Sequence, residues 1–228
     1  MGEMVEFRSN GGTARGYLAS PEAGAGPGVV VIQEWWGLVP HIQDVCDRFA
    51  AEGFTALAPD LYRGGSTTEP DEAGKLMMTL NLDEAAKDMG GAVDYLKASD
   101  KVRGEGVGVI GFCMGGGLAL MLAVQRPDDV KAAVPFYGLI PWASATPDWS
   151  KLGAAVQGHY AEKDEYFTPE NAEQLRTTLV DLGKEVELHI YPGADHAFFN
   201  DARPAVYDEE SARTAWVRTL EFLRSKLG

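Results

Sequence analysis

The sequence of 228 residues predicts one α/β domain, residues 1–228, in which helices cover both faces of a mostly parallel β-sheet. Two observations favour this fold class. Continuous apolar runs alternate with amphipathic segments along most of the chain, and such runs are typical of parallel strands buried on both faces. No internal repeat and no domain-sized linker interrupts the alternation. The length is sufficient for a substantial core.

The first element expected is an N-terminal β-hairpin. Two alternating segments, Val5–Phe7 and Ala14–Leu18, are joined across a Gly-containing turn at residues 9–12. This pair would be antiparallel and would precede the parallel part of the sheet.

The remaining strands are short apolar runs, and helical patterns separate them. We expect strands at Gly28–Gln33, Thr55–Ala58, Gly106–Gly111, Ala132–Tyr137, Ala154–Tyr160 and Val186–Tyr191. We expect helices at His41–Glu52, Leu82–Lys97, Met114–Gln125, Pro169–Leu182 and Asp208–Leu227. The Gly/Thr/Pro-rich stretch Gly64–Leu80 is interpreted as an excursion at the carboxyl edge of the sheet.

Composition excludes several classes of partner. The net charge is −14, and the Lys and Arg residues are scattered, so neither nucleic acid nor an anionic membrane is an expected partner. No apolar segment has the length of a membrane span, and no signal-peptide pattern opens the chain. The two cysteines have neither disulfide nor metal spacing. We therefore expect a cytoplasmic protein, monomeric or weakly homo-oligomeric, without metal or cofactor.

The segment 107–117 carries the strongest chemical signal. A β-branched run ends in Gly-Phe-Cys-Met-Gly, and a small-residue helical pattern follows. Gly111 and Gly115 would allow a sharp strand-to-helix turn with Cys113 at its apex, where serine is the usual residue. The helix N-terminus would favour a thiolate there. Cys46, in contrast, lies in an apolar-periodic run and is expected to be a buried helix residue.

Further reactive residues follow other strands of the predicted sheet. Ligands of parallel sheets lie outside the carboxyl ends of the strands. Glu34, Asp164 and His196 each follow a predicted strand. Cys113, Asp164 and His196 occur along the chain in the order nucleophile, acid, histidine, which is the order found in α/β-hydrolases. His196 would accept the thiol proton and a carboxylate would orient its ring. Asp195 is the less favoured alternative for that carboxylate.

The other three histidines are expected to have structural rather than catalytic roles. His159 and His189 lie within predicted strands, and His41 opens a helix. Backbone N–H groups of Trp35 and Met114 would form an oxyanion hole, because they follow the first parallel strand and the nucleophile. The aromatic residues Trp36, Tyr137 and Phe198 could line a substrate pocket, although aromatic residues are more often core.

Four segments together resemble the dienelactone hydrolase family. They are Gln-Glu-Trp-Trp-Gly (33–37), Ala-Pro-Asp-Leu-Tyr (58–62), Gly-Phe-Cys-Met-Gly-Gly (111–116) and Tyr-Pro-Gly-Ala-Asp-His-Ala-Phe (191–198). The resemblance covers almost the whole chain and implies an α/β-hydrolase fold. It also implies that Cys113, Asp164 and His196 form a triad, and that Glu34 helps to deprotonate the thiol when substrate binds.

One departure from the family pattern concerns the substrate. Members specialised for dienelactone hold the substrate carboxylate with arginines, one of them four residues after the catalytic histidine. Asn200 occupies that position here, so Arg63 and Arg203 are the candidates for a replacement clamp. We therefore expect substrate choice to depend less on a carboxylate than in those specialists.

The function predicted from the sequence is hydrolysis of a small-molecule carboxylic ester or lactone through a Cys113 thioester. Two alternatives stay open at this point. One is a redox or deglycase-type protein in which the elbow cysteine pairs with a glutamate. The other is a non-catalytic, ligand-binding homologue.

Overall fold

The computed structural model describes residues 1–9, 11–140, 142 and 145–228. Eight strands form one sheet in the order β1-β2-β4-β3-β5-β6-β7-β8. β1 and β2 are antiparallel to each other, β2 is antiparallel to β4, and all later pairs are parallel. The strands are β1 Glu3–Ser9, β2 Gly12–Ala19, β3 Gly26–Ile32, β4 Thr55–Pro59, β5 Val102–Phe112, β6 Val130–Phe136, β7 Ala155–Ala161 and β8 Val186–Tyr191.

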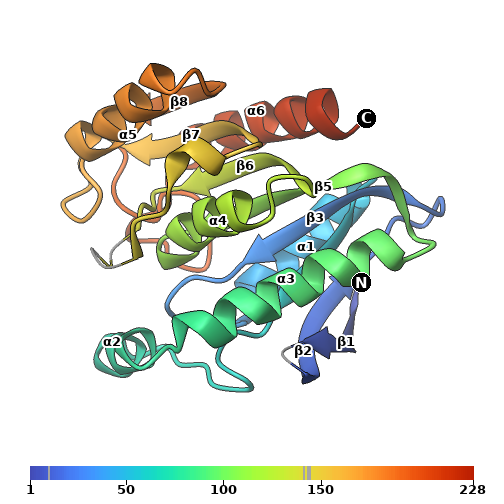
Figure 1. Ribbon diagram of the computed structural model, residues 1–228. Coiled ribbons are helices and arrows are strands. Elements are labelled where there is room, and N and C mark those ends of the chain that lie inside the picture. The colour runs from blue at the N-terminus through green and yellow to red at the C-terminus, as the bar shows by residue number, and fades with distance from the viewer. Residues whose placement is uncertain (10, 141, 143–144) are drawn as a thin grey trace.

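Helices cover the sheet on both faces, as Figure 1 shows. Two separate apolar clusters lie between the sheet and the helical layers: α3, α4 and α5 pack on one face, and α1 and α6 on the other. The helices are α1 Pro40–Ala51, α2 Pro70–Met78, α3 Leu82–Ala98, α4 Met114–Gln125, α5 Pro169–Asp181 and α6 Glu209–Leu227, and a 3₁₀ turn, η2, spans Trp149–Lys151. The predicted fold class is confirmed.

The N-terminal hairpin is confirmed as well, with Ser9 opposite Gly12 at its turn. Asn10, in the predicted turn, lies outside the described residues. β5 begins at Val102, four residues before the predicted start, and a register shift against β3 between Pro27 and Gly28 accommodates this extension. The extension pairs with the start of β3, where Gly26 lies opposite Val102.

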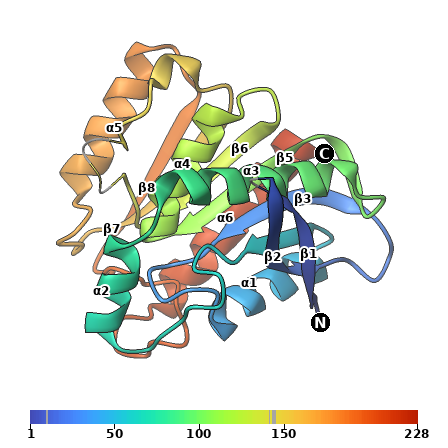
Figure 2. The same ribbon diagram turned by 60° about the horizontal axis from the view of Figure 1, so that its bottom comes forward.

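The excursion Gly64–Leu80 contains a helix that the sequence analysis did not assign. α2 occupies Pro70–Met78, beyond the end of α3, and is set apart from the two helical layers (Figures 1 and 2). Its only fully buried residue is Ala73. Because α2 buries so little, its sequence lacks the apolar periodicity of a helix that packs broadly on a core. Pro70 and two acidic residues do mark its first turn.

The carboxyl ends of the parallel strands place the predicted site residues at one edge of the sheet. Glu34 follows β3, Cys113 follows β5, Asp164 follows β7 and His196 follows β8. Because β3, β5, β6, β7 and β8 are successive neighbours, these loops converge. Within the described part of the chain, no helix is both long and apolar enough to cross a membrane.

Candidate active site

Cys113 lies at a sharp turn between β5 and α4, with φ 53° and ψ −120°. Positive φ is strained for a residue with a Cβ, so packing must hold the turn in place. A Cβ at Gly111 would come within 1.9 Å of the Gly115 oxygen, and one at Gly115 within 2.4 Å of the Gln33 oxygen. The two glycines are therefore required by the close approach of strand and helix.

Two backbone N–H groups, those of Met114 and Trp35, are candidates for the oxyanion hole. Cys113 is the N-cap of α4, so the N–H of Met114 belongs to the first turn and has no partner within the helix. Among the described residues, the N–H groups of Met114 and Trp35 have no hydrogen-bond acceptor. Both Trp35 and Met114 border the same cavity as Cys113. The oxyanion role of these two N–H groups stays a prediction.

His196 and Asp164 form a direct pair. The Nδ1 atom of His196 donates to Oδ2 of Asp164 at 2.7 Å. The other oxygen of this buried carboxylate accepts the backbone N–H groups of Tyr166 and Phe167, each at 2.9 Å. Asp164 is thus fixed in orientation, and it, rather than Asp195, is the carboxylate bonded to the His196 ring.

The other edge of the His196 ring faces the thiol. Burial lowers the pKa of His196, but its hydrogen bonds to Asp164 and Cys113, together with the negative charges of both groups, raise the pKa to about 10. An imidazolium beside the sulfur stabilises a thiolate. Cys113 and His196 line the same cavity, and Asp164 is bonded to the His196 ring.

Glu34 is buried beside this chain and is held by two neutral donors. The Asn200 amide donates to Oε2 of Glu34 at 2.8 Å, and the Tyr137 hydroxyl donates to Oε1 at 3.3 Å. Burial raises the pKa of Tyr137 well above its ordinary value, and the charges of Glu34 and Cys113 raise it further. Tyr137 therefore remains a hydrogen-bond donor to Glu34.

A cavity of about 1050 Å³ opens over Cys113. Its lining includes Trp35, Met114, His196 and Arg203. Arg203 stacks over the ring of Trp36 at 5.4 Å and forms no ion pair among the described residues. Arg63, in contrast, is paired with Glu84 and Asp88 at 3.4 and 3.5 Å and does not line the cavity.

Four of the predicted substrate-binding residues lie behind the cavity wall, which corrects their expected place. Asn200 and Tyr137 are buried and bind Glu34. Phe198 is fully buried among Phe136, Tyr137 and Tyr191. Trp36 is buried, and its ring packs against the ring of Trp35 and the guanidinium of Arg203.

The remaining histidines are outside the site. His41 contacts Asp201, and His159 is buried between Tyr191 and Thr219, with His189 stacked on it. These contacts agree with the structural interpretation of all three residues.

Tyr62 and the segment after Asp164 also contribute to the site, although neither was among the residues predicted to do so. The Tyr62 hydroxyl donates to the Met114 sulfur at 3.5 Å, and burial, followed by the Cys113 charge, raises the pKa of Tyr62. The sequence feature that could have indicated Tyr62 is the segment Ala-Pro-Asp-Leu-Tyr (58–62), which resembles the family pattern. The N–H groups of Tyr166 and Phe167 could not be predicted from the sequence, because any residue other than proline supplies a backbone donor.

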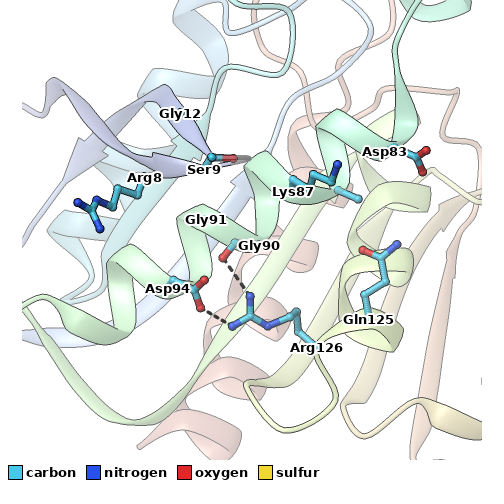
Figure 3. Close-up of a pocket in the computed structure, with 12 residues that line it drawn as sticks. Arg8, Ser9, Gly12, Asp83, Lys87, Gly90, Gly91, Asp94, Gln125 and Arg126 are labelled. Carbon is cyan, nitrogen blue, oxygen red and sulfur yellow. Dashed lines mark hydrogen bonds and ion pairs between the residues drawn. The ribbon is translucent and has the colours of Figure 1, made fainter.

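A second cavity, of about 880 Å³, lies between the N-terminal hairpin and the helices α3 and α4 (Figure 3). Arg126 points across it and bonds to Asp94 and to the Gly90 carbonyl. None of the predicted site residues borders this cavity. Arg126 joins α3 to the end of α4, so we assign this arginine a structural role.

The strand order, the strained turn after β5 and the bonded His196–Asp164 pair at the same edge of the sheet are typical of an α/β-hydrolase. The model of the dienelactone hydrolase family matches residues 14–227. The chain belongs to the dienelactone hydrolase family, and it is a carboxylic ester hydrolase.

Similar proteins match over full length. The protein usf of Aquifex pyrophilus is 41% identical, and a protein of Aquifex aeolicus named as a candidate carboxymethylenebutenolidase is 38% identical, with 100% of both chains covered in each case. The crystal structure of a candidate dienelactone hydrolase from Klebsiella pneumoniae superposes with a TM-score of 0.89 at 31% identity, covering 98% of both chains.

Proposed function

We propose that this protein hydrolyses esters or lactones through a thioester on Cys113, with His196 and Asp164 completing a catalytic triad. The observation that carries this proposal is the strained apex thiol in hydrogen-bonding contact with a histidine whose other nitrogen is fixed by a buried carboxylate. The name of the Aquifex aeolicus relative, a candidate carboxymethylenebutenolidase, is consistent with a lactone as substrate.

In the first half-reaction the Cys113 thiolate attacks the carbonyl carbon, and the negative oxygen receives the N–H groups of Trp35 and Met114. The carbon–oxygen ester bond then breaks, and protonated His196 gives its proton to the departing alcohol. In the second half-reaction His196 takes a proton from water, which attacks the thioester. The carbon–sulfur bond breaks, the acid is released and the thiolate is restored. Asp164 orients the ring throughout.

Glu34 has a separate role in this proposal. It is a buried carboxylate held by the neutral donors Asn200 and Tyr137. Neither bond is an ion pair. We assign Glu34 to adjusting the protonation of the thiol before attack.

The two alternatives are less well supported. A cysteine–glutamate redox or deglycase-type site needs no histidine oriented by a buried aspartate, yet the Asp164–His196 bond is present at 2.7 Å. A non-catalytic homologue would not require a strained backbone at Cys113 together with a neighbouring histidine of raised pKa.

The test is ester hydrolysis by matched cysteine variants. Cys113→Ala is expected to abolish hydrolysis of p-nitrophenyl acetate. Cys46→Ala is expected to retain it, because Cys46 is fully buried against the sheet in α1 and burial raises the pKa of its thiol. Wild-type activity in Cys113→Ala would contradict the proposal.

A further inference from the structure

The cavity over Cys113 is larger than the reacting groups require. Its volume of about 1050 Å³ lies at the upper end of the range for pockets that enclose drug-sized ligands. The proposed triad and oxyanion donors account for a minority of its lining. The rest of the wall is available to a part of the substrate that does not react.

That remaining wall is apolar on one side. Leu120 of α4, Leu139 and Ile140 after β6, Trp149 of η2 and Leu175 of α5 line it, and we call these five residues the apolar wall. They belong to the cluster that packs the α3–α5 face of the sheet or lie against it. Leu139, Ile140 and Trp149 are only partly buried, so they leave apolar surface facing the cavity. Covering such surface favours an apolar ligand.

The charged residues of the lining come from a different part of the fold. Lys163 and Glu165 lie in the loop after β7, and Asp195 and Arg203 lie in the segment after β8. The cavity therefore has a polar side, which also holds His196, and an apolar side formed by the apolar wall. The α5 residues Asn171, Gln174 and Thr178 border the cavity beside Leu175. A substrate that used both sides would carry its ester group at one end of a hydrocarbon arm.

We propose that the apolar wall binds an extended hydrocarbon arm of the substrate, so that esters with a medium-length aliphatic arm are preferred to compact esters. This inference rests on the proposed function, because Cys113 fixes where the ester group lies. Each methylene buried on the apolar wall raises kcat/KM by roughly fourfold until the wall is covered.

Two ester series test the inference and distinguish the side on which the arm lies. p-Nitrophenyl acetate, butyrate, hexanoate and octanoate place the arm on the acyl group, and acetate esters of linear alcohols place it on the leaving group. We expect kcat/KM to rise by about tenfold or more over the first two methylenes added in one series, and to level off once the wall is covered. Concentrations are kept below micelle formation.

A matched pair of variants on α5 locates the arm. Thr178 lines the cavity one turn after Leu175, whereas Val180 is exposed on the same helix and does not line it. Thr178→Phe fills the space beside the apolar wall and is expected to lower the long-to-short ratio of kcat/KM by about tenfold. Val180→Phe is expected to leave that ratio unchanged. Ile140→Trp, which enlarges a side chain of the apolar wall itself, should repeat the effect of Thr178→Phe.

The outcomes separate the two proposals. Equal kcat/KM along both series, with turnover that depends on Cys113, overturns the apolar arm and leaves the hydrolase intact. A rising series whose ratio is unaffected by both Thr178→Phe and Ile140→Trp also overturns it. Failure to hydrolyse any ester in either series contradicts the proposed function itself.

Discussion

At the scale of single residues, Asp164 and Glu34 are two buried carboxylates with different partners. Asp164 binds the ring of His196, whereas Glu34 binds the neutral groups of Asn200 and Tyr137. Asp164→Asn removes control of the His196 tautomer and support of the imidazolium. We expect kcat to fall by roughly two to four orders of magnitude, with KM much less affected.

Glu34→Gln is expected to act on the thiol instead. It keeps the shape of the side chain but removes the buried charge, so the pH profile of Cys113 alkylation by iodoacetamide should shift more than kcat falls. Alkylation rates and pH–rate profiles of the two variants provide the comparison. Superimposable profiles would remove the separate role of Glu34.

Arg203 is the arginine that the structure leaves available to an anionic substrate. It lines the cavity, whereas Arg63 is engaged by Glu84 and Asp88. A hydrogen bond to a charged group contributes about 1.5–3 kcal/mol. Arg203→Ala should therefore lower kcat/KM for a carboxylate-bearing lactone by roughly ten- to a hundredfold, with a much smaller effect on its neutral analogue. Arg63→Ala is the control, and an equal loss in both variants would contradict this assignment.

Residue-level prediction from the sequence succeeded where position along a strand determines position in space. Cys113, Asp164 and His196 each follow a parallel strand, so the shared edge of the sheet brings them together. It failed for Asn200, Tyr137 and Phe198, because sequence does not show whether an aromatic or amide side chain beside a site faces the cavity or the core.

At the scale of elements, the turn between β5 and α4 depends on glycine. A Cβ at Gly111 would meet the backbone oxygen of Gly115, and a backbone atom cannot rotate away as a side chain can. Gly111→Ala is expected to reduce the free energy of unfolding by at least about 2 kcal/mol. Gly74→Ala, in the open interior of α2, should raise it by up to about 1 kcal/mol.

Urea denaturation of both variants measures these changes, with the m-value checked for two-state behaviour. A stable, fully active Gly111→Ala protein would contradict the close packing of the turn.

The helix α2 marks the limit of element prediction from this sequence. Periodic apolar positions reveal helices that pack on a core, as α6 does, whereas α2 buries only Ala73 and makes few such contacts. Its first-turn Pro70 and acidic residues were present, yet the surrounding Gly/Thr/Pro composition favoured a loop.

At the scale of the whole molecule, two histidines give stability opposite dependences on pH. Burial, followed by the charges of His189 and Arg218, lowers the pKa of His159 well below its ordinary value of 6.5. The unfolded chain therefore binds a proton that the folded chain excludes, and stability is lost as the pH falls below 6.5. His196, whose pKa is raised to about 10, contributes stability that is complete below pH 6.5 and is lost as the pH rises toward 10.

Removing His159 should flatten the acid side of this profile. His159→Gln keeps an amide that can bond to Tyr191 and Thr219 but cannot take up a proton. We expect the slope of unfolding free energy against pH below 6.5 to decrease by up to about 1.4 kcal/mol per pH unit, the effect of one proton. Denaturation at several pH values measures the slope. An unchanged acid side would show that other groups govern it.

The most direct test of the central claim is to trap the covalent intermediate. Wild-type protein is mixed with p-nitrophenyl acetate, quenched in acid within the first turnovers, digested and examined by peptide mass spectrometry. The account predicts an acetyl group on the peptide that contains Cys113, released at neutral pH by hydroxylamine as expected of a thioester, and absent from Cys113→Ala. An acetyl group confined to another residue, with turnover unaffected by loss of Cys113, would contradict it.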